Sequence, residues 1–309
     1  MLKDDLTVLV NSCDAYSDCW YPFFKLWYDY FPDHSLKIIL NTESKSFSFD
    51  GLDIECLKLY HSGDRPPFGE QMNAHLKRIK TPFVLTMLED FFLNTPVDIS
   101  RIEQCVEWLK QDSKAAQFYF TNVVDDMNTV SVEHPGFSVK DQVSPYKINT
   151  MAGVWKKEKL LQYSIEKATP WEWEYYGSIK AFDADDRFYA VSKDVSPIMN
   201  FKILPQAAVT LGFPQLWGIV RGKWVVESVD ELFRQHGICV DYSERGVFQP
   251  EELKQSMGNK TLSAPLEELV GKELAGDIRR FEKMNRVRKI IHVKTYGSYL
   301  EYRREKSIG

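Results

Sequence analysis

Short runs of apolar residues alternate, in the first half of the chain, with segments in which apolar residues recur every three or four positions. Continuous runs are typical of buried strands, and spaced segments are typical of amphipathic helices. The run at residues 83–88 (FVLTML) is apolar at almost every position, which predicts an inner strand covered on both faces. The pattern as a whole predicts strands at 6–11, 36–41, 54–59, 83–88 and 115–120, and helices at 19–31, 70–79 and 98–110.

Strands that alternate with helices predict an α/β fold, with a doubly wound, mainly parallel sheet flanked by helices. Ligands of such sheets bind at the carboxyl ends of the strands. The polar residues that directly follow the predicted strands are therefore the first candidates for a site. They are Asn11, Ser12 and Asp14 after the first strand, Glu43 after the second, and Glu89 and Asp90 after the apolar run at 83–88.

The second half of the chain is less regular. Residues 122–149 show little periodicity and contain Pro135, Gly136 and Pro145, so we expect a long loop there. A short strand at 150–155, a short helix at 156–163 and a helix that follows Pro170 and ends near residue 181 come next. From residue 263 onward, one or two amphipathic helices are expected, with these residues on one face: Leu266, Leu269, Leu274, Ile278 and Phe281.

The charge of the chain limits its partners. The net charge is −5 over 309 residues, which argues against a dedicated nucleic-acid-binding protein, because phosphate neutralisation needs a basic excess. Residues 271–309 are nevertheless basic, with 11 Lys and Arg against five Asp and Glu. The five cysteines form no CxxC pair, no run approaches the length of a membrane-spanning helix, and no signal peptide is expected. These features predict a cytoplasmic protein of two domains, or of one large domain with an appendage.

Several kinds of chemistry lack their motif. The chain has no GxGxxG, GxxxxGK[ST], GxSxG or HExxH pattern, and no glycine follows the first predicted strand. What remains is a set of carboxylates at strand ends, of which the adjacent Glu89 and Asp90 stand out because ionised carboxylates are rarely buried unpaired. From the residues alone, this pair either holds a ribose hydroxyl, a metal or a substrate amine, or serves as a helix N-terminal acid or salt-bridge partner.

Residues 68–90 (FGEQMNAHLKRIKTPFVLTMLED) place Asn73 on a helix ahead of the strand that ends at Glu89 and Asp90. This segment resembles the nucleotide-sugar-binding core of the GT-A glycosyltransferases. Further segments are similar to other motifs of that family: VLVNSCDAYSD, IILNTE and TPWEWEYYGSIKA. With LEDFFL, the W.WE pattern and GIVRGKW, the chain looks most like a bacterial subgroup of capsular and surface-polysaccharide glycosyltransferases. The motifs span about residues 5–225, so the resemblance implies a GT-A catalytic domain at 1–225 and a mainly helical extension at 226–309.

The resemblance implies an enzyme that moves a sugar from a nucleotide diphospho-sugar to a hydroxyl of a glycan or lipid-linked acceptor. Glu174 or Glu172 would be the general base, with inversion at the anomeric carbon. Glu174 is preferred because it is expected to open its helix, although alternation also allows Glu172 to point inward. Trp171 and Trp173 would pack on a sugar, with core packing as the alternative. The nucleotide sugar would lie on Asn11, Ser12, Asp14, Glu43, Asn73, Glu89 and Asp90.

One departure from the family concerns its acidic motif, Asp-x-Asp, whose last carboxylate holds Mn²⁺ or Mg²⁺. Phe91 stands in that position here and cannot ligate a metal. Either Asp90 alone holds the cation with waters, or cationic side chains neutralise the departing diphosphate, with Arg221, Lys223 and Arg65 as candidates. The same departure supports an alternative reading, in which the chain is an inactive GT-A-like module that acts as a partner in a biosynthetic complex.

The basic residues at the end of the sequence allow two interpretations of what this segment binds. A predicted helical segment carries positive charges beside apolar residues Ile290, Ile291 and Val293. It would rest on an anionic inner membrane leaflet near a lipid-linked acceptor, or it would dock on the acidic body of the protein. The charged residues are Arg279, Arg280, Lys283, Arg286, Arg288 and Lys289.

Overall fold

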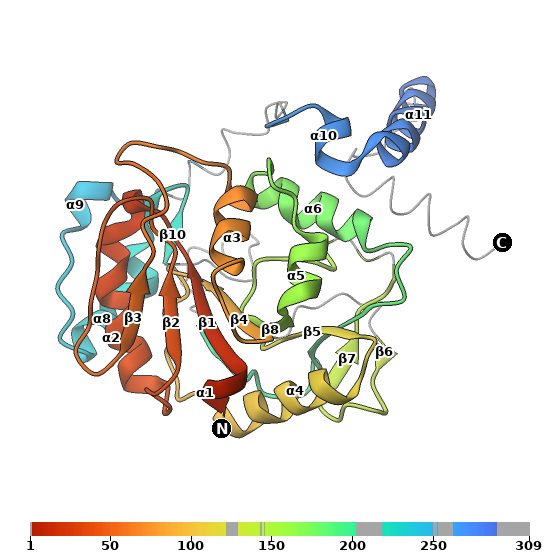
Figure 1. The fold of residues 1–309 in the computed structure, drawn as a ribbon. Coiled ribbons are helices and arrows are strands. Elements are labelled where there is room, and N and C mark those ends of the chain that lie inside the picture. The colour runs from red at the N-terminus through yellow and green to blue at the C-terminus, as the bar shows by residue number, and fades with distance from the viewer. Residues whose placement is uncertain are drawn as a thin grey trace.

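A computed structural model describes residues 2–121, 129–142, 144, 146–201, 218–249, 252 and 262–288, with side chains up to residue 280. Its core is a nine-stranded sheet in the order β3-β2-β1-β4-β8-β5-β9-β7-β6 (Figure 1). The strands are β1 (Leu6–Asn11), β2 (Lys37–Leu40), β3 (Asp53–Cys56), β4 (Phe83–Leu88), β5 (Ala115–Tyr119), β6 (Thr129–Val130), β7 (Phe137–Val139), β8 (Gly153–Lys156) and β9 (Arg187–Val191).

The sheet is mixed but mainly parallel. β3, β2, β1 and β4 are parallel neighbours, and β5 and β9 form a second parallel pair. β8 lies between β4 and β5 and is antiparallel to both, and β7 is antiparallel to β9 and β6. The predicted α/β fold class, with a mainly parallel sheet flanked by helices, is confirmed.

Helices cover both faces of this sheet. Those in the first part of the chain are α1 (Leu2–Asp5), the 3₁₀ turn η1 (Asp14–Cys19), α2 (Trp20–Tyr30), α3 (Phe68–Leu76), α4 (Ile99–Gln111), α5 (Lys157–Tyr163) and α6 (Pro170–Lys180). A small ribbon and further helices follow: β10 (Ile219–Val220), β11 (Lys223–Trp224), α8 (Val226–Gln235), α9 (Tyr242–Arg245), α10 (Leu266–Val270) and α11 (Lys272–Arg288). None of the helices in the described ranges combines the length and apolar character that crossing a bilayer requires.

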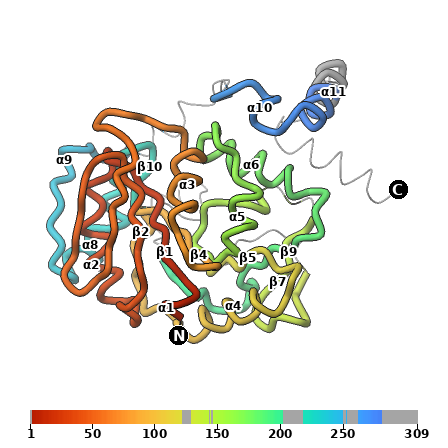
Figure 2. Tube along the Cα trace, in the orientation of Figure 1, coloured from red at the N-terminus to blue at the C-terminus, as the bar shows by residue number. Residues whose placement is uncertain are grey.

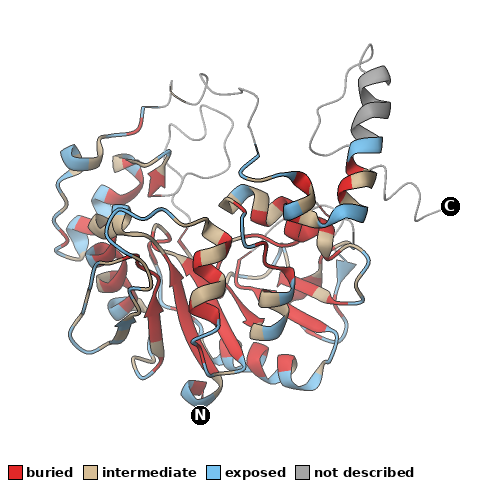
Figure 3. Cartoon of the chain, turned by 45° about the horizontal axis from the view of Figure 1, so that its top comes forward, coloured by how far each residue is buried: buried red, intermediate tan, exposed pale blue. Residues whose placement is uncertain are grey.

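Successive side chains of each strand point to opposite faces of the sheet, and the two faces form two separate hydrophobic cores. In β1, Val8 and Val10 point toward α2, α4 and α8, whereas Leu9 points toward α3, α5 and α6. β4 behaves in the same way, with Leu85 in the first cluster and Val84 in the second. A sheet covered on both faces must be apolar on both, which explains the near-continuous apolar runs of these strands. Figure 3 shows the central strands buried along most of their length.

The long loop predicted at 122–149 is only partly a loop. Its described part contains β6 and β7, which extend the sheet beyond β9. These strands are two and three residues long, and so short a run leaves little periodicity in a sequence. Residues 122–128 and 143, and Pro145 with them, lie outside the described residues. The strand expected at 54–59 is also shorter, ending at Cys56.

The helix after Thr169 begins earlier than expected. Thr169 is its N-cap, Pro170 is its first residue, and Glu172 completes a capping box by bonding back to Thr169. Proline suits the first helical turn, where its missing N–H costs nothing. Trp171 therefore lies on the helix rather than in a loop, and Glu172, not Glu174, lies in its first turn.

Beyond residue 225, the described part of the chain contains the helices α8, α9, α10 and α11, joined by turns and by an isolated bridge between Val247 and Trp224. Val229 and Phe233 of α8 join the same cluster as β1 and β4, whereas Leu266 and Leu269 of α10 pack on the α6 side of the sheet. Figure 2 shows α8 and α9 at one side of the molecule and α10 beside α6 at the other. The proposed boundary at 225/226 stays a prediction. Of the basic residues, Arg279 and Arg280 are described on α11, while the side chains of Lys283, Arg286 and Arg288, and Lys289 entirely, lie outside the described residues.

Candidate functional site

The topology creates a switch point between β1 and β4. From β1 the chain moves outward through β2 to β3, and β4 then returns to the opposite side of β1. Asn11 at the end of β1 pairs with Leu88 at the end of β4, so both strands finish at the same level. In open α/β sheets, the crevice outside the carboxyl ends of strands at such a point is the usual ligand site.

Glu89 and Asp90 follow β4 at this switch point. Glu89 is 6% exposed, and burial together with the neighbouring Asp90 raises the pKa of its carboxyl group well above the ordinary range. Burial raises the pKa of Asp90 to about 7, and Oδ1 of Asp90 is buried with no hydrogen-bond partner among the described residues. Ser12 donates a hydrogen bond to Glu89, and Arg245 lies near enough to lower both pKa values in part. An acid pair at a strand end in which one residue is buried and the other is half-buried with an enclosed, unbonded oxygen is typical of a functional site.

Asp14 and Glu43 form a reciprocal clasp between the loops after β1 and β2. Asp14 accepts hydrogen bonds from the Ser44 hydroxyl at 2.6 Å and from the N–H groups of residues 43, 44 and 45. Glu43 in return accepts from the Asp14 N–H, and from Gln71 Nε2 at 2.7 Å. The bonds of Asp14 to this loop lower the pKa of its carboxyl group, although burial opposes them. The two carboxylates therefore hold the loops around the crevice together.

Asn73 lies on α3, which packs over the α6 side of the sheet. Oδ1 of Asn73 and Oδ1 of Asn11 are buried and have no hydrogen-bond partner within the described part of the chain. α3 is tied to α6 where Gly69 donates its N–H to the Ala168 carbonyl, and a Cβ on Gly69 would lie 1.8 Å from the Ile165 carbonyl oxygen. This close approach fixes the position of Asn73 relative to the start of α6.

Glu172 and Glu174 have different surroundings. The Glu172 carboxylate accepts hydrogen bonds from the N–H and hydroxyl of Thr169 and of Ser263, which lower its pKa against the effect of burial. Glu174 is half-buried, and this burial raises its pKa. Its Oε1 accepts hydrogen bonds from the Thr150 N–H and hydroxyl, both at 2.7 Å, while Oε2 accepts none from the described residues. Glu172 is thus occupied as a helix cap, and Glu174 keeps one oxygen available.

The two tryptophans of α6 also differ. Trp173 is 1% exposed, donates its Nε1–H to Ser164 and packs edge-on against Phe68, so its ring belongs to the core and is not available to a sugar. The expectation that Trp173 packs on a sugar is therefore wrong, because its ring is enclosed on the α3 side of α6. Trp171 is 63% exposed at the start of α6, where an aromatic face is accessible.

The three predicted phosphate-binding cations lie apart. Arg221 donates to the Glu252 carbonyl and Lys223 forms an ion pair with the Glu252 carboxylate, on the β10–β11 ribbon. Arg65 is exposed in the connection between β3 and α3. The structure does not gather these three residues into one cluster.

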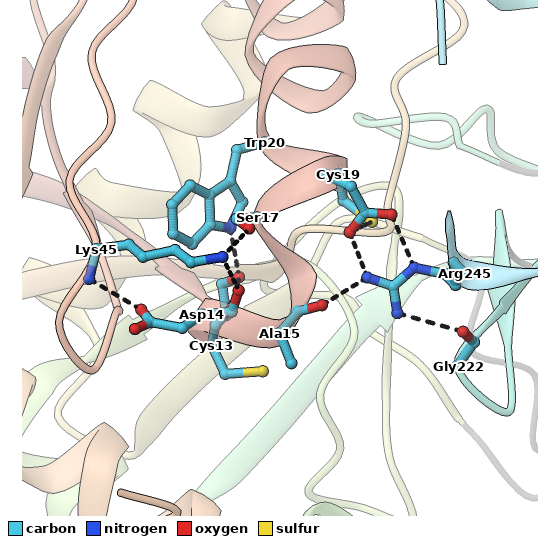
Figure 4. A network of polar contacts seen from close by, with 11 residues as sticks. Cys13, Asp14, Ala15, Ser17, Cys19, Trp20, Lys45, Gly222 and Arg245 are labelled. Carbon is cyan, nitrogen blue, oxygen red and sulfur yellow. Dashed lines mark hydrogen bonds and ion pairs between the residues drawn. The ribbon is translucent and has the colours of Figure 1, made fainter. Parts of the chain in front are cut away.

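Two cations that the sequence did not single out line the crevice. Arg245 reaches from α9 to the Ala15 carbonyl and to the Gly222 carbonyl (Figure 4). It also pairs with Asp18, and its guanidinium stacks over the Tyr16 ring at 4.2 Å. Lys45 donates to the Asp14 carbonyl and to Ser17 Oγ. Between them lies a pocket of about 390 Å³, lined by Asp14, Ala15, Ser17, Asp18, Lys45, Gly222, Glu244 and Arg245. No local sequence pattern marks Arg245, because it arrives from a distant part of the chain.

Phe91 and Phe92, which follow the acid pair, point into the core. Phe91 stacks on Phe201 with 4.6 Å between ring centroids, and Phe92 stacks on Trp224 and meets Phe233 edge-on. A Cβ on Gly218 would lie 2.3 Å from the Phe92 ring, so Gly218, directly before β10, packs closely against Phe92. The two phenylalanines therefore anchor the later chain beside β4.

The acid pair offers few protein ligands to a cation. Asp90 supplies one carboxylate oxygen that lacks a partner among the described residues, with the Glu89 carboxyl group beside it. Among the described residues, the three-residue group with metal-ligand spacing is instead Asp112, Glu133 and His134, near the start of β5. Its His134 is enclosed by aromatic rings and bonded to Asp112. Asp90 therefore suits a cation such as Mg²⁺, which takes one or two protein carboxylates and completes its shell with phosphate and water.

No protein-family model matches the chain, and no curated protein matches it in sequence. Among solved structures, it is similar to S. aureus TarS, with 9% identity and a TM-score of 0.42 over 62% of this chain and 36% of that one. TarS 1–349 in complex with UDP-GlcNAc gives 11% identity and a TM-score of 0.40, over 62% and 57%. A mycobacterial protein gives 14% identity and a TM-score of 0.36, over 76% of both chains. The chain spans 36 to 59% of the first TarS chains that it matches, and similarity at this level assigns no activity to it.

Proposed function

We propose that this protein is a GT-A-type glycosyltransferase that moves a sugar from a nucleotide diphospho-sugar to an acceptor hydroxyl. The observation that carries the proposal is the acid pair at the switch point between β1 and β4, with a buried Glu89 and a half-buried Asp90 whose Oδ1 is enclosed. A site at this position is where an α/β sheet binds a nucleotide, and the segment that builds it is the one that resembles the GT-A core.

The donor would lie across the carboxyl ends of β1, β2 and β4. Asn11, Ser12 and Asn73 would contact it directly, because two of them keep unbonded carbonyl oxygens and Ser12 faces Glu89. Asp14 and Glu43 would shape the same site chiefly through the clasp that joins their loops. Glu89 and Asp90 would hold the ribose, the sugar or a cation. A divalent cation bound at Asp90 would supply positive charge to the departing diphosphate.

Glu174 would act as the general base on the acceptor hydroxyl. Its Oε2, which accepts no hydrogen bond from the part of the chain that the structure describes, and its raised pKa suit a group that must take a proton near neutral pH. Attack from the face opposite the diphosphate gives inversion, which we propose as the outcome. Trp171 offers an exposed ring on the same helix for the acceptor or sugar. Arg221, Lys223 and Arg65 would contribute to phosphate binding only if the donor extends toward the β10–β11 ribbon or the β3–α3 connection.

The acceptor is proposed to be a glycan or a lipid-linked glycan of bacterial polysaccharide assembly, reached in the cytoplasm. α11 presents Arg280, whose side chain is 77% exposed and pairs with Asp277 on the same helix, and Arg279, which pairs with Glu267; the further basic residues toward the end of the sequence would add to association with an anionic inner leaflet. Capture of the protein by phosphatidylglycerol vesicles, and not by phosphatidylcholine vesicles, would test this part of the proposal.

Thermal unfolding against UDP, GDP, dTDP, CDP, ADP and CMP tests the central proposal. A ligand at ~100 times its dissociation constant adds about 2.7 kcal/mol to the free energy of unfolding, which raises the midpoint by several degrees. One nucleoside diphosphate is expected to stand out, and each is measured with Mn²⁺ and with a chelator to test Asp90 as a cation ligand. Asp90→Asn should weaken the response, and Asp50→Asn, on an exposed residue between β2 and β3, should not.

The same measurements distinguish an active enzyme from an inactive GT-A-like module, the two interpretations that Phe91 in the metal position allows. An inactive module that serves as a partner needs neither a nucleotide nor Glu174. Absence of a shift with every nucleotide, together with a Glu174→Gln variant that behaves like the parent protein, would support the inactive module and contradict the enzyme.

A further inference from the structure

Thr150 lies in the segment that leads into β8, and both of its hydrogen-bond donors reach one oxygen of Glu174. The N–H and the hydroxyl are each 2.7 Å from Oε1. We infer that Thr150 is the positioning residue of the base, holding Oε1 so that Oε2 alone takes the proton of the acceptor hydroxyl. This inference rests on the proposed function, because it concerns the same carboxylate.

The register of the sheet places this contact at the proposed site. β8 is antiparallel to β4, and Gly153 pairs with Thr86. Thr150 lies three residues before Gly153, and Glu89 lies three residues after Thr86, so the two reach the same edge of the sheet. Glu174 is therefore held at the edge that carries the acid pair, although it belongs to a different helix.

The segment that carries Thr150 is itself fastened. The Ile148 N–H donates to Ser178 Oγ at 2.9 Å, and the Ser178 hydroxyl donates to the Glu174 carbonyl at 2.6 Å. The Asn149 N–H donates to the Tyr119 hydroxyl at 2.7 Å. With its neighbours bonded to α6 and β5, Thr150 presents its donors in one place, and a fixed donor pair restricts the rotation of the carboxylate.

The pKa of Glu174 depends on the Thr150 hydroxyl and on the other charged and titratable groups around the carboxylate. Burial raises the pKa of Glu174, the two Thr150 bonds lower it, and Lys140, which follows β7, lowers it further. Tyr119 on β5 faces the same carboxylate, and the pKa of its phenol is raised, mainly by burial. Removing the Thr150 hydroxyl takes away one of the contacts that lower the pKa of Glu174. The raising effect of burial then has less to oppose it, and Glu174 should ionise at higher pH.

Thr150→Val removes the hydroxyl at nearly constant size, and Thr150→Ser restores it. A hydrogen bond to a charged group corresponds to about one pKa unit. In Thr150→Val, the acid limb of turnover against pH should move up by ~1 unit, with unchanged nucleotide binding, and Thr150→Ser should return it. Turnover is followed as nucleoside diphosphate released from UDP-glucose, UDP-N-acetylglucosamine, GDP-mannose and dTDP-glucose with water as acceptor. The Glu174 titration is also followed directly by ¹³C NMR of Glu-labelled protein, assigned with Glu174→Gln.

The outcomes separate the inference from the function on which it rests. If Glu174→Gln keeps full turnover, the base is wrong and the role of Thr150 falls with it. If Glu174→Gln is inactive while Thr150→Val keeps both the parent pH profile and the parent NMR midpoint, the proposed function stands and only the inference is overturned. A lower thermal midpoint in Thr150→Val without either pH shift means a structural role, and it also overturns the inference.

Discussion

Replacing Asp90 with Asn is expected to make the protein more stable above neutral pH. Burial raises the pKa of Asp90 from an ordinary 3.8 to about 7 in the folded chain. The folded protein therefore binds a proton more tightly than the unfolded chain does between these values. Stability rises with pH only where the unfolded state binds more protons, so this carboxyl group makes stability fall as pH rises from about 4 to 7.

The size of the effect follows from the two pKa values. Each unit of difference corresponds to about 1.4 kcal/mol, so full ionisation of Asp90 costs the folded state up to roughly 4 kcal/mol. Glu89 lies beside it, and burial raises the pKa of its carboxyl group as well, so the two acids titrate as a pair and the transition is broad. Asn carries no charge at any pH, and the variant should therefore match the parent protein near pH 4 and exceed it above pH 7.

Urea unfolding at pH values from 4.5 to 8.5 measures the difference. The parent protein should lose free energy of unfolding across this range relative to Asp90→Asn, while Asp50→Asn, on an exposed loop, should stay parallel to the parent. A stability gain that does not change with pH, or a variant less stable than the parent at pH 8, would refute the assignment of a buried, partly protonated Asp90. If Asp90→Asn gains stability and also loses its thermal shift with nucleotide, Asp90 serves nucleotide binding at a cost in the stability of the protein.

Three further outcomes are expected. Gly69→Ala should destabilise the protein by at least ~2 kcal/mol in thermal or urea unfolding, because its Cβ would lie 1.8 Å from a backbone oxygen, whereas Gly276→Ala in open space on α11 should be neutral or slightly stabilising. Glu174→Gln should lower turnover by ~10²–10⁴ and keep the fold, whereas Glu172→Gln should keep turnover and lose ~1 kcal/mol of stability as a weakened helix cap; the reverse pattern would show that the base is misassigned. Arg245→Met should cost ~1–3 kcal/mol and increase proteolysis between α9 and the sheet, since it leaves a partly buried carboxylate unpaired; an unchanged digestion pattern would mean that this ion pair does not hold α9 in place.

Much of the fold could be predicted from local pattern. The strands β1, β4 and β5 and the helices α2 and α4 lie within a residue or so of their predicted ranges, because each is a long run with a clear period. β6, β7 and the β10–β11 ribbon were missed, since a strand of two or three residues has no period to detect. The direction of β8 also escaped prediction, because pairing with β4 and β5 decides it and local pattern does not.

The candidate site was predictable only in outline. The rule that ligands meet strand ends led to Asn11, Glu89 and Asp90, and the structure places all three at one switch point. The residues that shift the pKa values of the site carboxylates could not be found from the sequence. Arg245 and Thr150 come from distant segments, and nothing in their own neighbourhood distinguishes them from ordinary surface residues.

The sequence by itself determined the α/β class, the apolar strands and the placing of two acids directly after the most apolar one, because these depend on residues close together in the chain. Only the tertiary structure decided which partners the two glutamates of α6 have. Both lie in the same dozen residues, yet Glu172 meets Thr169 and Ser263, while Glu174 meets Thr150 through one oxygen and accepts no bond on the other from the described residues. Hydrogen bonds and burial set whether a carboxylate caps a helix or can accept a proton, and both depend on segments that come together only when the chain folds.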